Sequence, residues 1–221
     1  MGAWSSRSLM VCVALFALIW AVSAVRADLV ADGGFEKPVV VSSNGAYTHF
    51  AGAMDAWTVS GSVDEVTTFE WTPHSGNQSL DLNGLSPGTI SQNLATHAGH
   101  TYDLTFYMSG NFGDYVGSQR SLEVYWGGSP AGTFTFTRPG SPYVYGDPSS
   151  LGWTLESALG LTASGSSTEL KFVSLESSSY AWGATLDDIS VRDTTPEPGT
   201  LSLLLLGLPG AAAFLRRRKQ A

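Results

Sequence analysis

The sequence predicts an all-β fold, a jelly-roll β-sandwich, flanked by an apolar N-terminal helix and a short apolar C-terminal helix. The middle of this 221-residue chain is rich in Ser, Thr, Gly, Val and aromatic residues and has no convincing helical pattern. Short segments of alternating apolar and polar residues recur there between turn sequences, which is typical of antiparallel sandwiches. Setting the terminal segments aside leaves about 168 residues, 28–195, which suffice for one hydrophobic core.

The first 27 residues resemble a secretory signal peptide. Arg7 precedes an apolar stretch over residues 9–21, and small residues follow at 22–24 and 25–27. Signal peptides have a basic start, an apolar centre and small residues at the cleavage site, so we expect cleavage before Asp28. The alternative is an uncleaved N-terminal anchor, which the short apolar stretch makes the weaker interpretation.

Eight segments of the middle region place apolar side chains on one face of an extended chain, as strands do. They are residues 57–59, 62–66, 79–82, 102–108, 122–126, 132–136, 169–173 and 185–191. Turn sequences such as Asn83-Gly84 and Arg138-Pro139-Gly140 separate them. About eight strands joined by turns predict a sandwich over residues 28–192.

The charge balance of the middle region excludes one class of partner. Residues 28–195 contain 5 Lys or Arg and 18 Asp or Glu, a formal charge of −13. So acidic a surface argues against nucleic acid as a partner and is compatible with neutral glycans and divalent cations. The only cysteine, Cys12, lies in the signal peptide, so the domain is expected to fold without disulfides.

The C-terminal segment, residues 193–221, combines a rigid motif, an apolar run and a basic end. The motif is Pro196-Glu197-Pro198, the run covers residues 201–215, and the end is Arg216, Arg217, Arg218 and Lys219. Fifteen apolar residues fall short of the roughly 20 that cross a bilayer comfortably, and the four cations would stay on the cytoplasmic side of the inner membrane. This arrangement resembles the PEP-CTERM sorting signal, which implies an exported protein that is processed by an exosortase. The alternative is an ordinary short membrane tail.

Segments of the middle region resemble a family of extracellular jelly rolls. They are Asp32-Gly33-Gly34-Phe35-Glu36, residues 76–84 and the closing residues 186–191. In this order and spacing they are similar to the choice-of-anchor C domain, a galactose-binding-like relative of the DUF642 proteins. The resemblance implies a β-sandwich at the cell surface and no established molecular activity.

The same resemblance implies a structural Ca²⁺ ion between the two ends of the domain. Glu36 and either Asp187 or Asp188 would supply carboxylates, and a carbonyl near Asp32 would add a neutral ligand, as Ca²⁺ prefers oxygen ligands. Neighbouring residues of a strand point to opposite faces, so only one of the two aspartates should point inward. The alternative is that Glu36 pairs with Lys37 or Arg192 and that the aspartates are solvated.

Exposed aromatic residues are candidates for carbohydrate binding, because the flat C–H faces of sugars stack on aromatic rings. Tyr115 and Trp126 are the predicted binding residues, with polar neighbours around Tyr115. Further platforms are Trp71, Tyr143, Tyr145, Trp153 and Trp182. The alternative is that the tryptophans fill the core, which we expect for Trp57 and Trp153 because they alternate with apolar neighbours.

No residue pattern indicates catalysis. Asp64 and Glu65 are adjacent, so on a strand they diverge and cannot act as a paired acid and base. We therefore expect a non-enzymatic, exported protein of the cell surface or exopolysaccharide matrix, structural or adhesive, with carbohydrate as a candidate ligand. The alternatives are a purely structural matrix protein without a ligand and, less favoured, a glycan-active enzyme.

Overall fold

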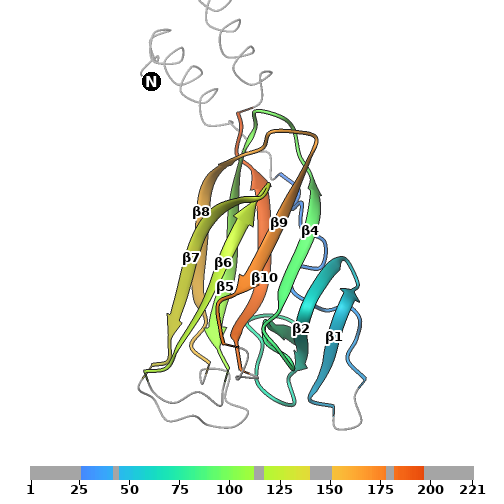
Figure 1. The fold of residues 1–221 in the computed structure, drawn as a ribbon. Coiled ribbons are helices and arrows are strands. Elements are labelled where there is room, and N and C mark those ends of the chain that lie inside the picture. Colours follow the sequence, from blue (N-terminus) through green and yellow to red (C-terminus); the bar gives the residue numbers. More distant parts are fainter. Residues whose placement is uncertain (1–25, 42–44, 112–116, 140–150, 178–181, 197–221) are drawn as a thin grey trace, which may run out of the picture.

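The computed structural model describes residues 26–41, 45–111, 117–139, 151–177 and 182–196. Its described residues form strands and no helix (Figure 1), which confirms the all-β prediction. The strands are β1 (Tyr47–Met54), β2 (Trp57–Thr67), β3 (Gln78–Asp81), β4 (Thr89–Ala95), β5 (Thr101–Gly110), β6 (Gln119–Trp126), β7 (Ser129–Thr137), β8 (Thr154–Thr162), β9 (Ser167–Ser174) and β10 (Ala184–Asp193). The described part of the chain has no helix that is long and apolar enough to cross a membrane. The two flanking helices predicted from the sequence lie outside the described residues.

All ten strands belong to one hydrogen-bonded sheet that folds into two layers. The strand order is β7-β6-β9-β4-β2-β3-β10-β5-β8, and β1 pairs with β2 beside this path. β2 makes the corner: Thr58 pairs with Ser91 of β4, whereas Asp64 pairs with Asp81 of β3. One layer therefore contains β4, β9, β6 and β7, and the other contains β3, β10, β5 and β8.

Strict alternation of side chains builds the core between the layers. In β5, Tyr102, Leu104, Phe106 and Met108 are all buried, while the residues between them are half-buried. β6 and β9 alternate in the same way and face β5 and β10 across the interior. Aromatic rings interlock there, with Phe106 in edge contact with Phe172 at 5.2 Å between ring centroids.

The strand prediction was correct for most of the sheet, but it divided one strand and missed three others. The segments 57–59 and 62–66 are one continuous strand, β2, and the other six segments correspond to β3, β5, β6, β7, β9 and β10. The strands β1, β4 and β8 were not predicted. Each of them buries few side chains, so its sequence lacks a clean apolar alternation.

The two ends of the domain meet at one end of the sandwich. The Leu29 backbone N–H donates to the Val191 carbonyl at 3.0 Å, and the Asp28 carboxylate accepts from the Val191 N–H at 3.0 Å. β10 runs from Ala184, which pairs with Gly110, to Asp193, which pairs with Tyr102. Its ten residues span about 30 Å, so the start of β10 and the end of β5 lie at the far end.

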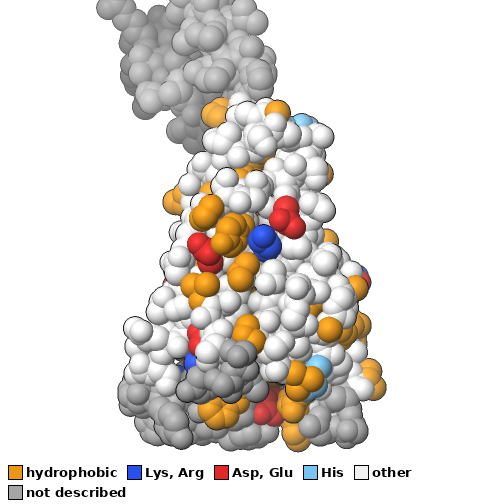
Figure 2. Space-filling model, in the orientation of Figure 1, with side chains coloured by type: hydrophobic (Ala, Val, Ile, Leu, Met, Phe, Trp, Pro, Cys, Tyr) orange, Lys and Arg blue, Asp and Glu red, His pale blue; other side chains and the backbone are white. Residues whose placement is uncertain are grey.

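One outer face of the sandwich carries few charges. Figure 2 shows mostly uncharged side chains on the side of β6 and β9, with a basic group near the centre among a few acidic ones. The Lys171 ammonium lies 4.6 Å from the centre of the Tyr125 ring and 4.0 Å from the Glu169 carboxylate. This face presents one aromatic ring that is already covered by a cation.

Candidate functional site

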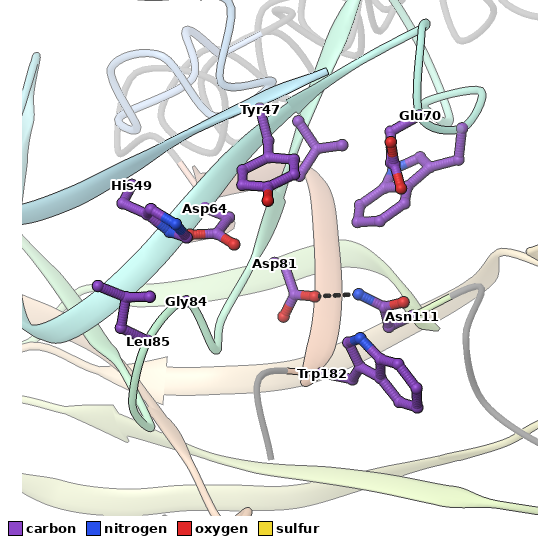
Figure 3. A pocket seen from close by; sticks show the side chains of 11 residues that line it. Tyr47, His49, Asp64, Glu70, Asp81, Gly84, Leu85, Asn111 and Trp182 are labelled. Atoms are coloured by element: carbon purple, nitrogen blue, oxygen red, sulfur yellow. Dashed lines mark hydrogen bonds and ion pairs between the residues drawn. The ribbon is translucent and has the colours of Figure 1, made fainter. Parts of the chain in front are cut away.

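A pocket of about 270 Å³ opens at the end of the sandwich remote from the described termini (Figure 3). It forms where β1 and β2 meet the start of β10 and the end of β5. Its lining residues are Tyr47, His49, Asp64, Val66, Glu70, Trp71, Asp81, Gly84, Leu85, Asn111 and Trp182. These residues come from six separate segments of the chain, so the pocket exists only in the folded protein.

Two carboxylates enter the pocket from neighbouring strands. Asp64 of β2 and Asp81 of β3 are direct cross-strand partners, and partners in an antiparallel pair point to the same face. Glu65 follows Asp64 and therefore points to the other face, where it is fully buried and accepts a hydrogen bond from Gln78 at 2.9 Å. The expected divergence of Asp64 and Glu65 is present, and it is Asp81 that joins Asp64.

Asp81 lies at the back of the pocket and is 1% exposed. The backbone N–H groups of Asn83 and Gly183 donate to one of its oxygens at 2.9 Å, and the Asn111 amide donates to the other at 2.6 Å. Burial raises the pKa of Asp81 to about 8, although these three hydrogen bonds lower it. Gly183 permits this arrangement, because a Cβ at that position would lie 2.7 Å from an Asp81 oxygen.

Asp64 lies nearer the opening and its side chain is 13% exposed. Its Oδ1 is hydrogen-bonded to the His49 ring, and its Oδ2 has no hydrogen bond from the described residues. Burial raises the pKa of Asp64 to about 6, while the hydrogen bond with His49 lowers it. Gly84 leaves room for this carboxylate, since a Cβ there would lie 2.5 Å from Asp64 Oδ1.

Aromatic rings form the other walls of the pocket. Trp182 is 40% exposed and Tyr47 is 37% exposed, and both rings border the space in front of the two aspartates (Figure 3). Trp71 closes the inner side: its indole N–H donates to Ser79 at 2.8 Å, and it packs with Leu151 in a small apolar cluster under the loops. The pocket thus combines open aromatic faces with carboxylates and an amide.

The structure corrects the prediction that Trp126 binds carbohydrate. Trp126 is only 6% exposed, its ring packs 5.5 Å from that of Tyr102, and its N–H donates to the Thr162 carbonyl at 3.0 Å. A ring that is covered on its faces cannot stack on a sugar, so Trp126 is a core residue. Trp71 is likewise buried. Tyr115, the other predicted residue, lies outside the described residues, as do Tyr143 and Tyr145.

The residues predicted to bind Ca²⁺ come together where the opening segment meets β10. Asp187 is fully buried and accepts hydrogen bonds from the backbone N–H groups of Ser75 and Asp188, while Asp188 points outward to His74 at 2.6 Å. Burial raises the pKa of Asp187 to about 8. One aspartate therefore faces inward and the other outward.

The remaining predicted ligands act as hydrogen-bond acceptors for the backbone. The Asp32 carboxylate accepts from the N–H groups of Glu36 at 2.9 Å and Lys37 at 3.2 Å, and the Glu36 carboxylate accepts from those of Asn77 at 2.6 Å and Gln78 at 3.1 Å. Within the described ranges, no three His, Cys, Asp or Glu side chains are placed to hold a metal ion. The calcium site stays a prediction.

Of the sorting segment, the structure describes only the first residues. Pro196 is the last described residue. Glu197, Pro198 and the basic residues Arg216, Arg217, Arg218 and Lys219 lie outside the described part of the chain.

Fold and pocket together define the class of protein: a jelly-roll β-sandwich module with a recessed acidic and aromatic pocket at one end. The chain belongs to the DUF642 family, "Protein of unknown function (DUF642)", which it matches over residues 28–192. Residues 194–219 match the PEP-CTERM protein-sorting motif. This motif indicates export, processing by an exosortase and a location in the cell envelope.

Comparison with known proteins gives one curated relative and several solved structures of similar fold. Halomucin from Haloquadratum walsbyi is 31% identical over 194 residues, which are 85% of this chain and 2% of Halomucin. The chain therefore spans a very small part of that relative.

The similar solved structures have low sequence identity. TmCBM61 in complex with beta-1,4-galactotriose is 16% identical, with a TM-score of 0.47 over 76% of this chain and 99% of that one. The CBM22-1 xylan-binding domain of Paenibacillus barcinonensis Xyn10C is 18% identical, with a TM-score of 0.46 over 78% and 97%. Similarity at this level carries no ligand and no residue role to this chain.

Proposed function

We propose that this protein is a non-enzymatic surface module that binds carbohydrate in the pocket at the free end of its sandwich. The sorting motif takes the protein to the envelope, and the module works at the cell surface or in the exopolysaccharide matrix as an adhesive or structural component. The observation that carries this proposal is the lining of the pocket, where the exposed ring of Trp182, the carboxylate of Asp64 and the amide of Asn111 border the same space.

The chemistry of this lining suits a sugar. A pyranose ring has an apolar C–H face, which can stack on the open face of Trp182, and hydroxyl groups around its edge. Those hydroxyls need acceptors and donors that are held in place, and Asp81 and Asn111 fix one another through their hydrogen bond of 2.6 Å. A largely preformed site of this kind loses little conformational entropy on binding.

The position of the pocket supports a role outside the membrane. The described chain ends at Pro196, beside the end of β10, and the pocket lies at the start of β10. Since the strand spans about 30 Å, a module held through its C-terminal segment would present the pocket away from its point of attachment.

Binding of the full chain, purified in detergent, to a broad glycan array tests the proposal. We expect binding to at least one polysaccharide class, and its loss in Trp182→Ala. Tyr125→Ala is the matched control, because this ring lies on the β6 face outside the pocket. An array without any signal would contradict carbohydrate binding, and loss in Tyr125→Ala alone would contradict the pocket as its site.

The pairing of Asp64 with Asp81 favours a second candidate, a glycan-cleaving enzyme, because glycosidases use two carboxylates on one cleft. Three N–H groups already hold the Asp81 oxygens, however, and the residue is 1% exposed, so it is poorly placed to give a proton to a leaving group. Incubation with the bound glycan and assay for new reducing ends distinguishes the two: we expect none, and their release would favour the enzyme.

A further inference from the structure

The pocket is lined mainly by acidic and aromatic side chains; its basic group is the His49 imidazole, and no Lys or Arg lines it. Asp64, Asp81 and Glu70 contribute three carboxyl groups. The Lys and Arg residues of the described chain all lie elsewhere: Arg26, Lys37, Arg120, Arg138, Lys171 and Arg192. Three carboxyl groups that face one imidazole and no Lys or Arg favour a ligand that donates hydrogen bonds and carries a positive charge.

The Asp64 carboxylate is placed to meet such a cation. Among the described residues, His49 is hydrogen-bonded to Oδ1 of this carboxylate. The side chain is partly exposed, so Oδ2 is left for a ligand. Behind it lies Asp81, whose oxygens are held by N–H groups and which forms the polar back of the pocket. A ligand that places a positively charged group with several hydrogen-bond donors in front of Asp64 would therefore complement the pocket.

The aromatic wall restricts what carries that charge. The exposed rings of Trp182 and Tyr47 border the same space as the two aspartates (Figure 3). An aromatic face attracts an ammonium group through its quadrupole and also covers an apolar surface next to it. A bare metal ion would make no use of these rings, whereas a sugar that carries an amine would use both the rings and the carboxylates.

We infer that the pocket recognises a glycan residue with a free amino group, that is, a hexosamine without an N-acyl group. Its ammonium group donates to Asp64, and its ring stacks on Trp182. The inference rests on the proposed carbohydrate binding and narrows it to one class of polysaccharide. An N-acyl group would remove the charge and leave Asp64 without its partner.

Three tetrasaccharides with the same β-1,4-linked backbone test the inference, because they differ only at carbon 2. Cellotetraose has a hydroxyl there, the N-acetylglucosamine tetramer an acetamido group and the glucosamine tetramer a free amine. Titration calorimetry of the full chain in detergent, at about pH 6 and at about pH 7 so that the protonation of the amine is varied, measures the three affinities. We expect the amino tetramer to bind roughly tenfold or more tightly than the other two, as a charge-assisted hydrogen bond would give.

Variants that each remove one carboxylate test which residue causes the preference for the amino tetramer. In Asp64→Asn we expect the preference for the amino tetramer to disappear, and in Glu70→Gln to shrink. Glu169→Gln is the matched control: it removes the same charge from β9, outside the pocket, and should keep the preference. Should Asp64→Asn fail to give the native melting curve, Glu70→Gln and the salt dependence of binding decide, since added salt should weaken the amino tetramer selectively.

Several outcomes would overturn the inference without touching the proposed function. Equal or tighter binding of cellotetraose or of the acetylated tetramer, lost in Trp182→Ala, would leave a carbohydrate module without amine recognition. Spermidine binding as tightly as the amino tetramer would show recognition of charge alone. No binding of the amino tetramer would also refute the inference, whereas the proposed function fails only if the whole glycan array is silent.

Discussion

Asp64 and Glu65 are neighbours in the chain and lie in opposite surroundings. Asp64 points into the pocket, whereas Glu65 points into the interior, where its Oε2 has no hydrogen-bond partner among the described residues. Because successive side chains of a strand point to opposite faces, one acid of the pair reaches the pocket surface and the other is buried. The alternation was readable from the sequence, but the cross-strand partner of Asp64 was not, since only the register with β3 brings Asp81 beside it.

The tryptophans show the same limit. The expectation that Trp57 fills the core is confirmed, since it is 1% exposed. Trp126 and Trp182 could not be distinguished by sequence, because both are large apolar residues beside turns. What separates them is the packing of Tyr102 on Trp126 and the position of Trp182 before the first residue of β10.

Trp126→Ala and Trp182→Ala should therefore have opposite effects. Removing the buried Trp126 ring leaves a cavity and an unpaired Thr162 carbonyl, so the free energy of unfolding should fall by about 3–5 kcal/mol. Trp182→Ala removes a half-exposed ring, and its cost should stay below about 1 kcal/mol while glycan binding is lost. Urea unfolding together with calorimetry measures both. Similar unfolding midpoints for the two variants would contradict this assignment of core and site.

Among the elements, β2 decides the shape of the sandwich. It pairs with β4 through residues 58–60 and with β3 through residues 64–67, so it passes from one layer to the other. Gly61 lies at the change, with a φ of +74°, and a Cβ there would lie 2.2 Å from the Pro87 carbonyl oxygen. The sequence predicted two short strands here, because Ser60-Gly61 interrupts the apolar alternation; the bend of a single strand produces the same pattern.

Gly61→Ala should destabilise the domain through both strain and contact. Alanine at a positive φ costs about 1–2 kcal/mol, and the close Pro87 oxygen forces a further shift of the corner. Gly160→Ala in β8 is the matched control, since it has a φ of +70° and nothing within 4 Å of the added carbon. We expect a clearly larger drop in melting temperature for Gly61→Ala, and equal drops would refute a role for the close contact.

Two of the three strands that escaped prediction, β1 and β8, share a physical cause. β8 lies at the edge of the sheet with Leu155 and Leu159 exposed, so its apolar residues do not mark an inner face. β1 lies beside the main path of the sheet and pairs only with β2 among the described strands. Strands of the centre, such as β5 and β9, are specified by their own sequences, whereas these strands are specified by the neighbour they pair with.

At the scale of the whole molecule, the excess of acid extends into the interior. Glu65, Asp81 and Asp187 are each at most 1% exposed, and burial is the main cause that raises the pKa of each to about 8. The net charge of the domain could be read from the sequence, but the burial of these three acids depends on the fold. Their titration should therefore dominate the pH dependence of stability.

Stability should fall as the pH rises from about 5 to 8. The folded pKa of these acids lies above the unfolded value of 3.8 or 4.5, so in this interval the folded state holds protons that the unfolded state has released. Each group then lowers the free energy of unfolding by up to about 1.4 kcal/mol per pH unit.

Glu65→Gln places an uncharged amide at the unpartnered Oε2, so the stability of the variant should match that of the wild type at pH 5 and exceed it at pH 8. Urea unfolding at both pH values measures this, with Glu169→Gln, a surface acid, as the control that should leave the slope unchanged. Parallel curves for Glu65→Gln and the wild type would mean that Glu65 stays ionised in the folded protein and that its burial does not set this pH dependence.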